Sequence, residues 1–327
     1  MTAAAVPSGI LLVDKPQDLT SHDVVARVRR AANTRKVGHA GTLDPMATGL
    51  LIVGVGTATR LLTHVVGTDK VYEATIRLGE STVTDDAEGE LVERAETQAV
   101  DAIGDEAIAA GIRRLTGPIE QVPSTVSAIK VDGKRAYARA RAGEDVELAA
   151  RSVTIHAFEL KETRRMPGLI DLDVRVACSS GTYIRALARD LGRSLGVGGH
   201  LTALRRTAVG PFDVADATPL DALASGSVPV AAVLRSPADA AARLFPVLEL
   251  DPQQAIDLGH GKKIKVDASQ AQLAQGRSQW RSTGSPRQAI DPGIRAAVDH
   301  AGRLVALASV SATGVVRVET GFPNEES

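Results

Sequence analysis

Apolar and polar residues alternate along two segments of the chain, and two other segments are continuously apolar. The alternation covers residues 70–79 and 169–178, which is typical of strands that bury one face. The continuous runs GILLV at 9–13 and LLIVGVG at 50–56 are short and rich in branched residues, as in strands buried on both faces. The pattern therefore predicts a strand in each of these four segments.

Helical spacing of apolar residues appears between these predicted strands. Ser21 is suited to cap a helix whose apolar residues recur at helical spacing up to Ala32. A second helix is expected over residues 105–115. A third is expected after the Ser-Ser-Gly-Thr turn at 179–182, with Leu187 on its buried face. Strands and helices mixed in this way indicate an α+β fold built on a mixed sheet.

Loops are expected in segments that show neither the alternation of a strand nor the apolar spacing of a helix. Residues 38–49 hold three glycines and a proline and predict a loop, and residues 81–90 predict an acidic turn. Beyond Pro211 the chain is rich in alanine, proline and serine up to about residue 244, which predicts a linker that contains a helix.

The length of 327 residues corresponds to about two domains. We expect a disordered N-terminus over residues 1–8, a first domain over 9–240 and a second domain over 245–323. In the second domain, the apolar segments LVALASV and VVRVET predict two paired strands around a turn at 312–314.

Local charge is more informative than the overall balance. The 38 basic and 39 acidic residues give a net charge of −1, so no overall basic field indicates a nucleic-acid partner. Residues 21–36 and 128–141 each hold five basic residues and one acidic residue, a net charge of +4. These two clusters are either solvated faces or the walls of a groove for a polyanion.

The composition also bears on the compartment. The N-terminus lacks the basic start and long apolar stretch of a signal peptide, and the uncharged run at 45–59 is too short to span a bilayer. The single cysteine rules out an intramolecular disulfide, which suits a reducing compartment. We therefore expect a soluble cytoplasmic protein.

The glycine-rich loop at 38–49 is a candidate for chemistry. Asp44 precedes Pro45, which disfavours a helical conformation at the aspartate, and His39 lies in the same loop. Such a loop can present a carboxylate beside the basic end of the preceding helix, as a nucleophile requires. An ordinary Asp-Pro turn between a helix and a strand explains the same residues.

Other motifs are explained more simply. GVGTAT at 54–59 lacks the third glycine and the long crossover helix of a dinucleotide site. The scattered histidines and the isolated Cys178 predict no metal site, and the acidic cluster at 85–90 fits a solvated turn better than a cation site. Tyr72 fits a core position, unless it lines a cavity at the surface of the sheet. Arg185, one turn into the third helix, is either a surface arginine or the partner of a buried carboxylate.

Four segments together resemble one family. GHAGTLDPMATGLL, DKPQDLTSHDVV, YEATIRLGESTVTDDAEG and CSSGTYIRALARDLG are similar to the bacterial TruB-type tRNA pseudouridine synthases, which act on uridine 55 of the T-loop. They follow the family's order and cover about residues 9–210. GHGKKI and DHAGRLVALASV resemble a small PUA-like RNA-binding barrel. The resemblance implies a mixed-sheet pseudouridine synthase catalytic domain over 9–240 and a C-terminal PUA-like β domain over 245–323.

The resemblance also implies roles for single residues. Asp44 matches the aspartate that attacks the target nucleotide and allows the N-glycosidic bond to break. Tyr72 matches the tyrosine that stacks on the flipped base and assists proton removal, and Arg185 matches the arginine paired with the aspartate. The positions that match contacts to the substrate nucleotide are His39, Tyr72, Tyr183 and Leu204. Asp86 lies in a family motif and is expected to join the network around Arg185.

The partners follow from the same resemblance. Residues 124–148 resemble an insertion that clamps the T-arm of tRNA, and the residues expected to contact RNA are Lys15, Lys130, Lys134 and Arg135. A carboxylate can attack and then leave again, so we expect no metal and no organic cofactor. We expect tRNA as the partner, with no membrane, guide RNA or obligatory protein partner. The alternative is a non-catalytic tRNA-binding or folding chaperone on the same scaffold.

Overall fold

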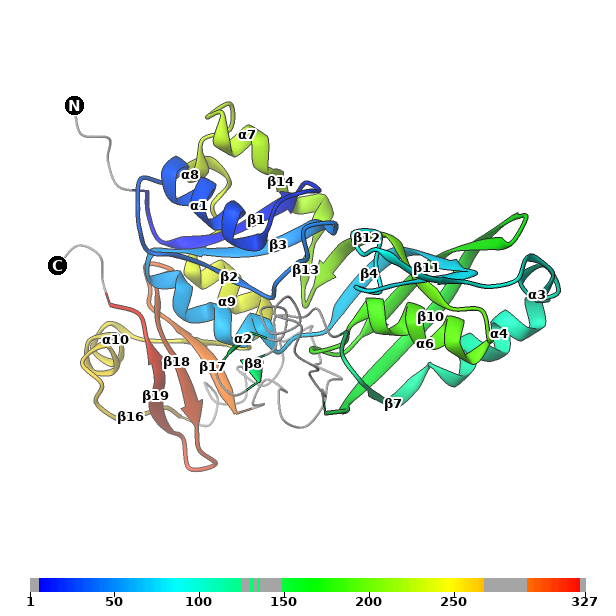
Figure 1. Ribbon diagram of the computed structural model, residues 1–327. Coiled ribbons are helices and arrows are strands. Elements are labelled where there is room, and N and C mark those ends of the chain that lie inside the picture. Colours follow the sequence, from blue (N-terminus) through cyan, green and yellow to red (C-terminus); the bar gives the residue numbers. More distant parts are fainter. Residues whose placement is uncertain (1–5, 125–129, 132–133, 136–148, 268–292, 324–327) are drawn as a thin grey trace. The chain divides into compact units, whose positions relative to one another are not determined.

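A computed structural model describes most of the chain (Figure 1). The described residues are 6–124, 130–131, 134–135, 149–267 and 293–323. Contacts group them into two compact units. Unit one holds the described residues up to Thr68 and from Ala208 onward, and unit two holds those from Asp69 to Thr207.

The N-terminal sheet of unit one is built on two long buried strands. Strand β1 (Gly9–Lys15) is antiparallel to β3 (Thr48–Val55), with Leu12 opposite Ile52. The short strands β2 (Val37–Ala40) and β14 (Thr218–Pro219) pair with β3 and β1, respectively. The apolar runs therefore form strands as predicted. His39 lies on strand β2, however, so the predicted loop begins only after Ala40.

Helices cover both faces of this sheet (Figure 1). Helix α1 (Ser21–Ala31) is confirmed, but its cap is Thr20 and not Ser21. The Thr20 hydroxyl accepts a hydrogen bond from the Asp23 amide at 3.1 Å, and the Asp23 carboxylate accepts one from the Thr20 amide at 2.9 Å. The other helical segments of unit one up to residue 244 are η1 (Gly56–Leu61), α2 (Leu62–Val66), η2 (Val214–Asp216), α7 (Leu220–Ala224), α8 (Val230–Val233) and α9 (Pro237–Leu244).

The segment after Pro211 is folded and is not a linker. Strand β13 (Phe212–Asp213) and helix α7 begin it, and Leu220 and Leu223 are buried. Helix α9 packs between the N-terminal sheet and the C-terminal strands, and Ala240 and Leu244 belong to one apolar core with residues of both. Alanines allow this close approach because their side chains are small. The prediction was wrong because it judged these alanines by composition alone.

The C-terminal strands form a second, mixed sheet in unit one. Its order is β15 (Val247–Glu249), β17 (Ile294–Val298), β18 (Leu304–Val310), β19 (Val315–Gly321) and β16 (Ile264–Lys265). Strands β18 and β19 are the hairpin predicted from the sequence, and helix α10 (Pro252–Gly259) packs on β18. Strand β15 runs parallel to β17, whereas the other pairs are antiparallel.

Unit two is a five-stranded layer with helices on it. The strand order is β12 (Gly199–Val209), β4 (Lys70–Leu78), β11 (Leu169–Cys178), β10 (Arg151–Met166) and β7 (Gly117–Gln121). Its helices are α3 (Thr97–Asp101), α4 (Asp105–Arg114) and α6 (Ile184–Ser194), and its short strand pairs are β5 (Glu80–Thr82) with β6 (Leu91–Arg94) and β8 (Lys130–Val131) with β9 (Lys134–Arg135). The α+β fold class with a mixed sheet and a small C-terminal β structure is confirmed. The predicted domain boundaries stay a prediction.

Among the described residues, no helix has the length and apolar character needed to cross a membrane. Most of the insertion predicted over 124–148 lies outside the described residues. So do the side chains of the three basic residues predicted there to contact RNA, namely Lys130, Lys134 and Arg135.

Candidate functional site

The Asp44 carboxylate stands on a tight turn between β2 and β3. Gly41 has φ 81° and Gly49 has φ 99°, so both ends of the connection use a backbone conformation that side chains rarely adopt. Within it, the Ala47 amide donates to the Asp44 carbonyl at 3.1 Å, which closes a turn around Pro45. Asp44 is half-buried, and its neighbours Leu43 and Met46 are buried. The turn thus fixes one carboxylate between apolar anchors.

The Lys15 side chain binds the backbone on one side of this turn. Its side chain is fully buried, and its ammonium donates to the carbonyls of Pro16 at 2.9 Å, Leu19 at 2.7 Å and Pro45 at 3.2 Å. Charge-assisted hydrogen bonds of this kind are about twice as strong as neutral ones. Lys15 therefore connects the end of β1 to the residue after Asp44. The prediction that Lys15 contacts RNA stays a prediction.

Ser21 fixes the other side of the turn. Its hydroxyl accepts a hydrogen bond from the Leu43 amide at 2.8 Å and donates one to the Leu43 carbonyl at 3.1 Å. The first residue of α1 therefore binds the backbone immediately before Asp44. This function of Ser21 could not be read from the sequence, because a serine before a helical pattern indicates a cap.

His39 lies on β2, opposite Val53 on β3. Its ring is half-buried and meets the ring of His22 edge to face, with the centroids 5.5 Å apart. Its predicted contact with the substrate nucleotide stays a prediction.

Tyr72 is the third residue of β4 in unit two. It is buried and stands opposite Val176 of β11, in the alternating pattern predicted from the sequence. Two residues earlier, Lys70 stands opposite Cys178. Burial, assisted by the charge of Arg206, lowers the pKa of Lys70 to about 8, and burial raises the pKa of the Cys178 thiol to about 12. The strand therefore carries an unusual buried lysine close to the tyrosine.

Arg185 is buried and pairs with Asp86. The Arg185 Nη1 atom lies 3.2 Å from the Asp86 Oδ2 atom, and both side chains are at most 5% exposed. The same Nη1 donates to the Thr84 carbonyl at 2.9 Å. Of the two readings of Arg185 left open by the sequence, the structure supports the partner of a buried carboxylate. In unit two that carboxylate is Asp86, so its expected place in the Arg185 network agrees with the geometry.

In the turn that carries it, Asp86 is buried and Asp85 is half-buried, whereas Glu88 and Glu90 are exposed. The solvated turn expected from the acidic sequence therefore holds except at Asp85 and Asp86. Asp85 has φ 58°, and its carboxylate accepts a hydrogen bond from the Ser124 hydroxyl at 2.6 Å and pairs with Arg189 Nη1 at 3.2 Å. Burial raises the pKa of Asp85 above the usual range, while Ser124 and Arg189 act in the opposite direction. Asp86 also forms a parallel bridge with Leu201.

These carboxylates are bound to arginines and hydroxyls of the protein. Across the described part of the chain, no group of three or more histidine, cysteine, aspartate or glutamate side chains is arranged to hold a metal ion.

Two further predicted residues belong to unit two. Tyr183 is the residue before the first turn of α6, and its backbone is bound by the buried side chain of Gln121. Leu204 is buried on β12. The sequence reasoning missed Gln121 and Arg189, because their partners lie 62 and 104 residues away along the chain. No local pattern indicates such contacts.

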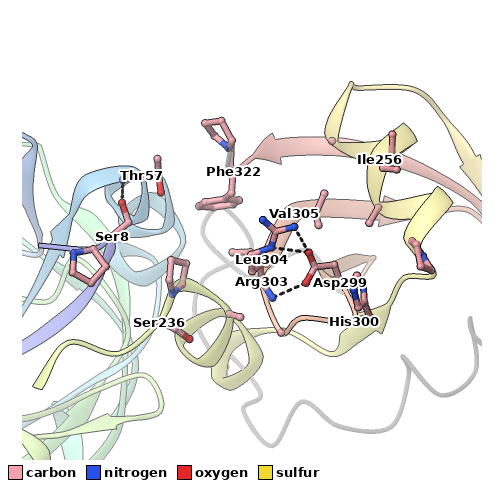
Figure 2. A pocket seen from close by; sticks show the side chains of 18 of the residues that line it. Ser8, Thr57, Ser236, Ile256, Asp299, His300, Arg303, Leu304, Val305 and Phe322 are labelled. Carbon is pink, nitrogen blue, oxygen red and sulfur yellow. Dashed lines mark hydrogen bonds and ion pairs between the residues drawn. The ribbon is translucent and has the colours of Figure 1, made fainter. Parts of the chain in front are cut away.

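Unit one also contains a pocket (Figure 2). Its volume is about 890 Å³. It is lined by α10, by the turn between β17 and β18, and by residues next to α9, among them Ile256, Arg303 and Ser236. Arg303 donates to the Asp299 carboxylate at 2.9 Å, which closes this turn. The lining includes none of the predicted site residues.

Two family models match this chain. The model described as the TruB family pseudouridylate synthase N-terminal domain matches residues 29–184. The model described as the tRNA pseudouridylate synthase B C-terminal domain matches residues 185–235. Together they span the Asp44 turn, Tyr72, Arg185 and Leu204. The chain belongs to the TruB family. The family prediction made from the sequence is thereby confirmed.

Individual TruB relatives match over most of their length. A protein named tRNA pseudouridine synthase B from Leifsonia xyli subsp. xyli is 62% identical over 261 residues, which are 80% of this chain and 85% of the relative. Its namesake from Paenarthrobacter aurescens is 54% identical over 92% of this chain and 90% of the relative. The namesake from Corynebacterium glutamicum is 48% identical over 99% of both chains.

Solved structures show the same fold. A chain from an H/ACA RNP bound to a substrate RNA that contains 2'-deoxyuridine matches with a TM-score of 0.67 and 23% identity, over 97% of this chain and 86% of that one. A chain from a Cbf5-Nop10-Gar1 complex matches with a TM-score of 0.67 and 25% identity, over 96% of this chain and 85% of that one.

Proposed function

We propose that this protein isomerises uridine 55 in the T-loop of tRNA to pseudouridine. The observation that carries the proposal is the Asp44 turn, a half-buried carboxylate held by Lys15 and Ser21 in a chain of the TruB family. The close relatives bear the name tRNA pseudouridine synthase B. The position of the target uridine and the use of an aspartate follow from the family resemblance.

Asp44 acts as the nucleophile in this proposal. Its carboxylate attacks the target nucleotide, and the N-glycosidic bond breaks. The detached uracil turns and is joined to the ribose through carbon, and the proton on that carbon is then removed. The carboxylate leaves in its original form, as covalent catalysis requires. Substrate and product are isomers, so the reaction needs no oxidant, reductant or group donor.

Tyr72 and Arg185 take the other two catalytic roles. An aromatic side chain on a buried strand can stack on a base that has left its helix, and enzymes that act on a base must remove it from its stack. Arg185 is a permanently charged group in a buried setting, where its charge acts more strongly than in water. His39, Tyr183 and Leu204 are proposed to contact the same nucleotide.

RNA binding is assigned to the local basic clusters. Folded RNA is bound through its shape, its phosphates and stacking, so a net charge of −1 does not oppose the proposal. The cluster over 128–141 lies mostly outside the described residues, and its role as a clamp remains part of the proposal. The same holds for binding of RNA by the C-terminal sheet.

We further propose that the protein acts alone, without a guide RNA or protein partner. The curated relatives are named as tRNA enzymes, whereas the structural neighbours come from an H/ACA RNP and from a Cbf5-Nop10-Gar1 complex and show only the fold at 23–25% identity. The single cysteine is a buried thiol, as suits a reducing compartment, and the cytoplasm is the proposed location.

The test is to incubate the purified protein with an unmodified T-arm hairpin and to map pseudouridine by chemical labelling. The proposal expects product at the position of uridine 55 without any addition. A hairpin in which that uridine is replaced by cytidine is the matched control. Binding without product would favour the tRNA-folding chaperone instead.

A further inference from the structure

We propose that Gln121 is a positioning residue for the isomerisation, because its buried amide fixes the backbone from which Tyr183 and Arg185 project. The inference rests on the proposed function, and it concerns a residue that the resemblance does not assign. Gln121 is the last residue of β7 and is 1% exposed.

The Gln121 side chain binds both backbone groups of one residue. Its Nε2 atom donates to the Tyr183 carbonyl at 3.0 Å, and its Oε1 atom accepts from the Tyr183 amide at 2.8 Å. A backbone residue offers one donor and one acceptor, so only one orientation of the glutamine amide satisfies both bonds. Two bonds to a single residue fix its backbone more firmly than one bond does.

The start of α6 has no cap from the side chain of Tyr183, its own capping residue, and the backbone groups of Tyr183 are bound by a residue from elsewhere. Tyr183 precedes the helix in an extended conformation, with φ −105° and ψ 108°, and it makes no capping hydrogen bond through its side chain. The first turn of α6 contains no acidic residue, and Gly181, with φ 88°, precedes it. In a capping box, a glutamate or glutamine within the helix accepts from the amide of the capping residue. Here a glutamine from a distant strand performs that function.

Two further contacts join the same segment to the Arg185–Asp86 pair. The carbonyl of Val122 accepts from Arg189 Nη2 at 2.7 Å, one helical turn beyond Arg185. The hydroxyl of Ser124 donates to Asp85, the neighbour of Asp86, at 2.6 Å. Residues 121–124 therefore connect α6 to the turn that carries Asp86. A displacement at Gln121 reaches both partners of the buried pair.

The inference predicts a loss of rate without a comparable loss of RNA affinity. Misplacement of a reacting group by about 1 Å can cost about 10²-fold in rate. Gln121 is buried, so its contribution to phosphate binding is small. We expect Gln121→Met, which keeps the length of the side chain and removes both hydrogen bonds, to lower the single-turnover rate by about 10²-fold. The Kd for a T-arm hairpin should change less than about threefold.

Asp101→Ala is the matched control. The Asp101 carboxylate accepts a hydrogen bond from the Gly168 amide at 3.0 Å, in the turn between β10 and β11 of the same unit. Its removal also deletes a side-chain to backbone bond, but one with no link to Tyr183. We expect Asp101→Ala to lower the thermal midpoint and to keep the wild-type single-turnover rate.

The experiment compares single-turnover rate, Kd, thermal midpoint and amide hydrogen exchange over residues 180–188 in the full chain. Faster exchange together with a rate loss confined to Gln121→Met supports the inference. A Gln121→Met rate within threefold of wild type, or an equal loss in Asp101→Ala, overturns it. If the methionine variant does not fold, Gln121→Glu, which keeps the acceptor for the Tyr183 amide, is judged by the same criteria. An inactive wild type would refute the proposed function, whereas an active wild type with an active Gln121→Met variant refutes only this inference.

Discussion

The buried Arg185–Asp86 pair allows a quantitative prediction for the stability of unit two. The charged atoms lie 3.2 Å apart in side chains that are at most 5% exposed. At an effective dielectric constant of about 20, two unit charges at this separation attract by about 5 kcal/mol. Most of this attraction offsets the cost of removing both groups from water. Loss of one partner removes this attraction from the charge that stays buried, which costs about 3–5 kcal/mol.

Asp86→Asn and Arg185→Met remove one charge each while keeping most of the shape. Asp86 also accepts a hydrogen bond from the Glu88 amide at 3.0 Å, and the asparagine oxygen can retain that bond. We therefore expect each single variant to lower the free energy of unfolding by about 3 kcal/mol or more. At about 2–4 °C per kcal/mol, the thermal midpoint should fall by roughly 6–12 °C.

The double variant Asp86→Asn with Arg185→Met allows the interaction energy of the pair to be separated from the effect of each single substitution. Because neither charge remains, we expect it to be more stable than Asp86→Asn alone, with a coupling energy above about 2 kcal/mol. The assay is urea unfolding followed by far-ultraviolet circular dichroism on all four proteins of the cycle. Single losses below about 1 kcal/mol that simply add in the double variant would refute the reasoning, because they would show that neither charge depends on its partner in the pair.

Three further predictions concern other parts of the molecule. Lys15→Met should lower the single-turnover rate at least tenfold, because the link between the Pro45 carbonyl in the Asp44 turn and the carbonyls of Pro16 and Leu19 is lost, and an unchanged rate would exclude a supporting role for the lysine. Lys70 has a pKa of about 8 in the folded protein, below the usual 10.5. Between about pH 8 and 10.5 the unfolded chain therefore binds more protons at this lysine than the folded protein does. The free energy of unfolding consequently rises with pH over this interval. The difference in urea midpoint between wild type and Lys70→Met should therefore change over that interval, and a constant difference contradicts it. Binding of tRNA should weaken with salt, with log K falling by about 0.7 per log unit of salt for each phosphate contact; this slope should flatten when three basic residues are neutralised together, namely Lys130, Lys134 and Arg135.

Periodic burial is the part of the fold that the sequence predicts well. Strand β4 alternates because one face is buried, and both the pattern and its cause are local. The same holds for β11 and for helix α6, whose buried residues include Leu187 and Leu191. The family motifs then identify candidate residues that no period could single out.

Three of the failed predictions involve partners that lie outside the local sequence pattern. Strand β2 exists because it pairs with β3, so His39 is in a strand although its segment is rich in glycine. Within the acidic turn, Asp86 is buried and Asp85 is half-buried because two arginines of α6, about 100 residues later, supply the opposite charge. Ser21 was expected to cap α1, but it binds the backbone of Leu43. In each case the local pattern was interpreted correctly, but the residue that it contacts could not be predicted from it.

The sequence predicted the candidate catalytic residues but not the residues that support them. Asp44, Tyr72 and Arg185 were named from family motifs, whereas the side chains that hold the backbone near Asp44 and Arg185 were not recognised in that role. Lys15 and Gln121 bind carbonyl and amide groups that are present at almost every position of the chain. Contacts to the backbone leave no specific signature in the sequence of the partner, so only the structure identifies these supporting residues.

The central claim, that Asp44 is the nucleophile of a tRNA pseudouridine synthase, is tested most directly by one comparison. Wild type and Asp44→Asn are each incubated in excess over a T-arm hairpin, and pseudouridine at the target uridine is measured over time by chemical labelling, with Kd determined on the same preparations. The account predicts complete conversion by the wild type, no product with Asp44→Asn, and affinities within about tenfold of each other, or 1.4 kcal/mol. Product formed by Asp44→Asn, once contamination by wild type is ruled out, would contradict the account.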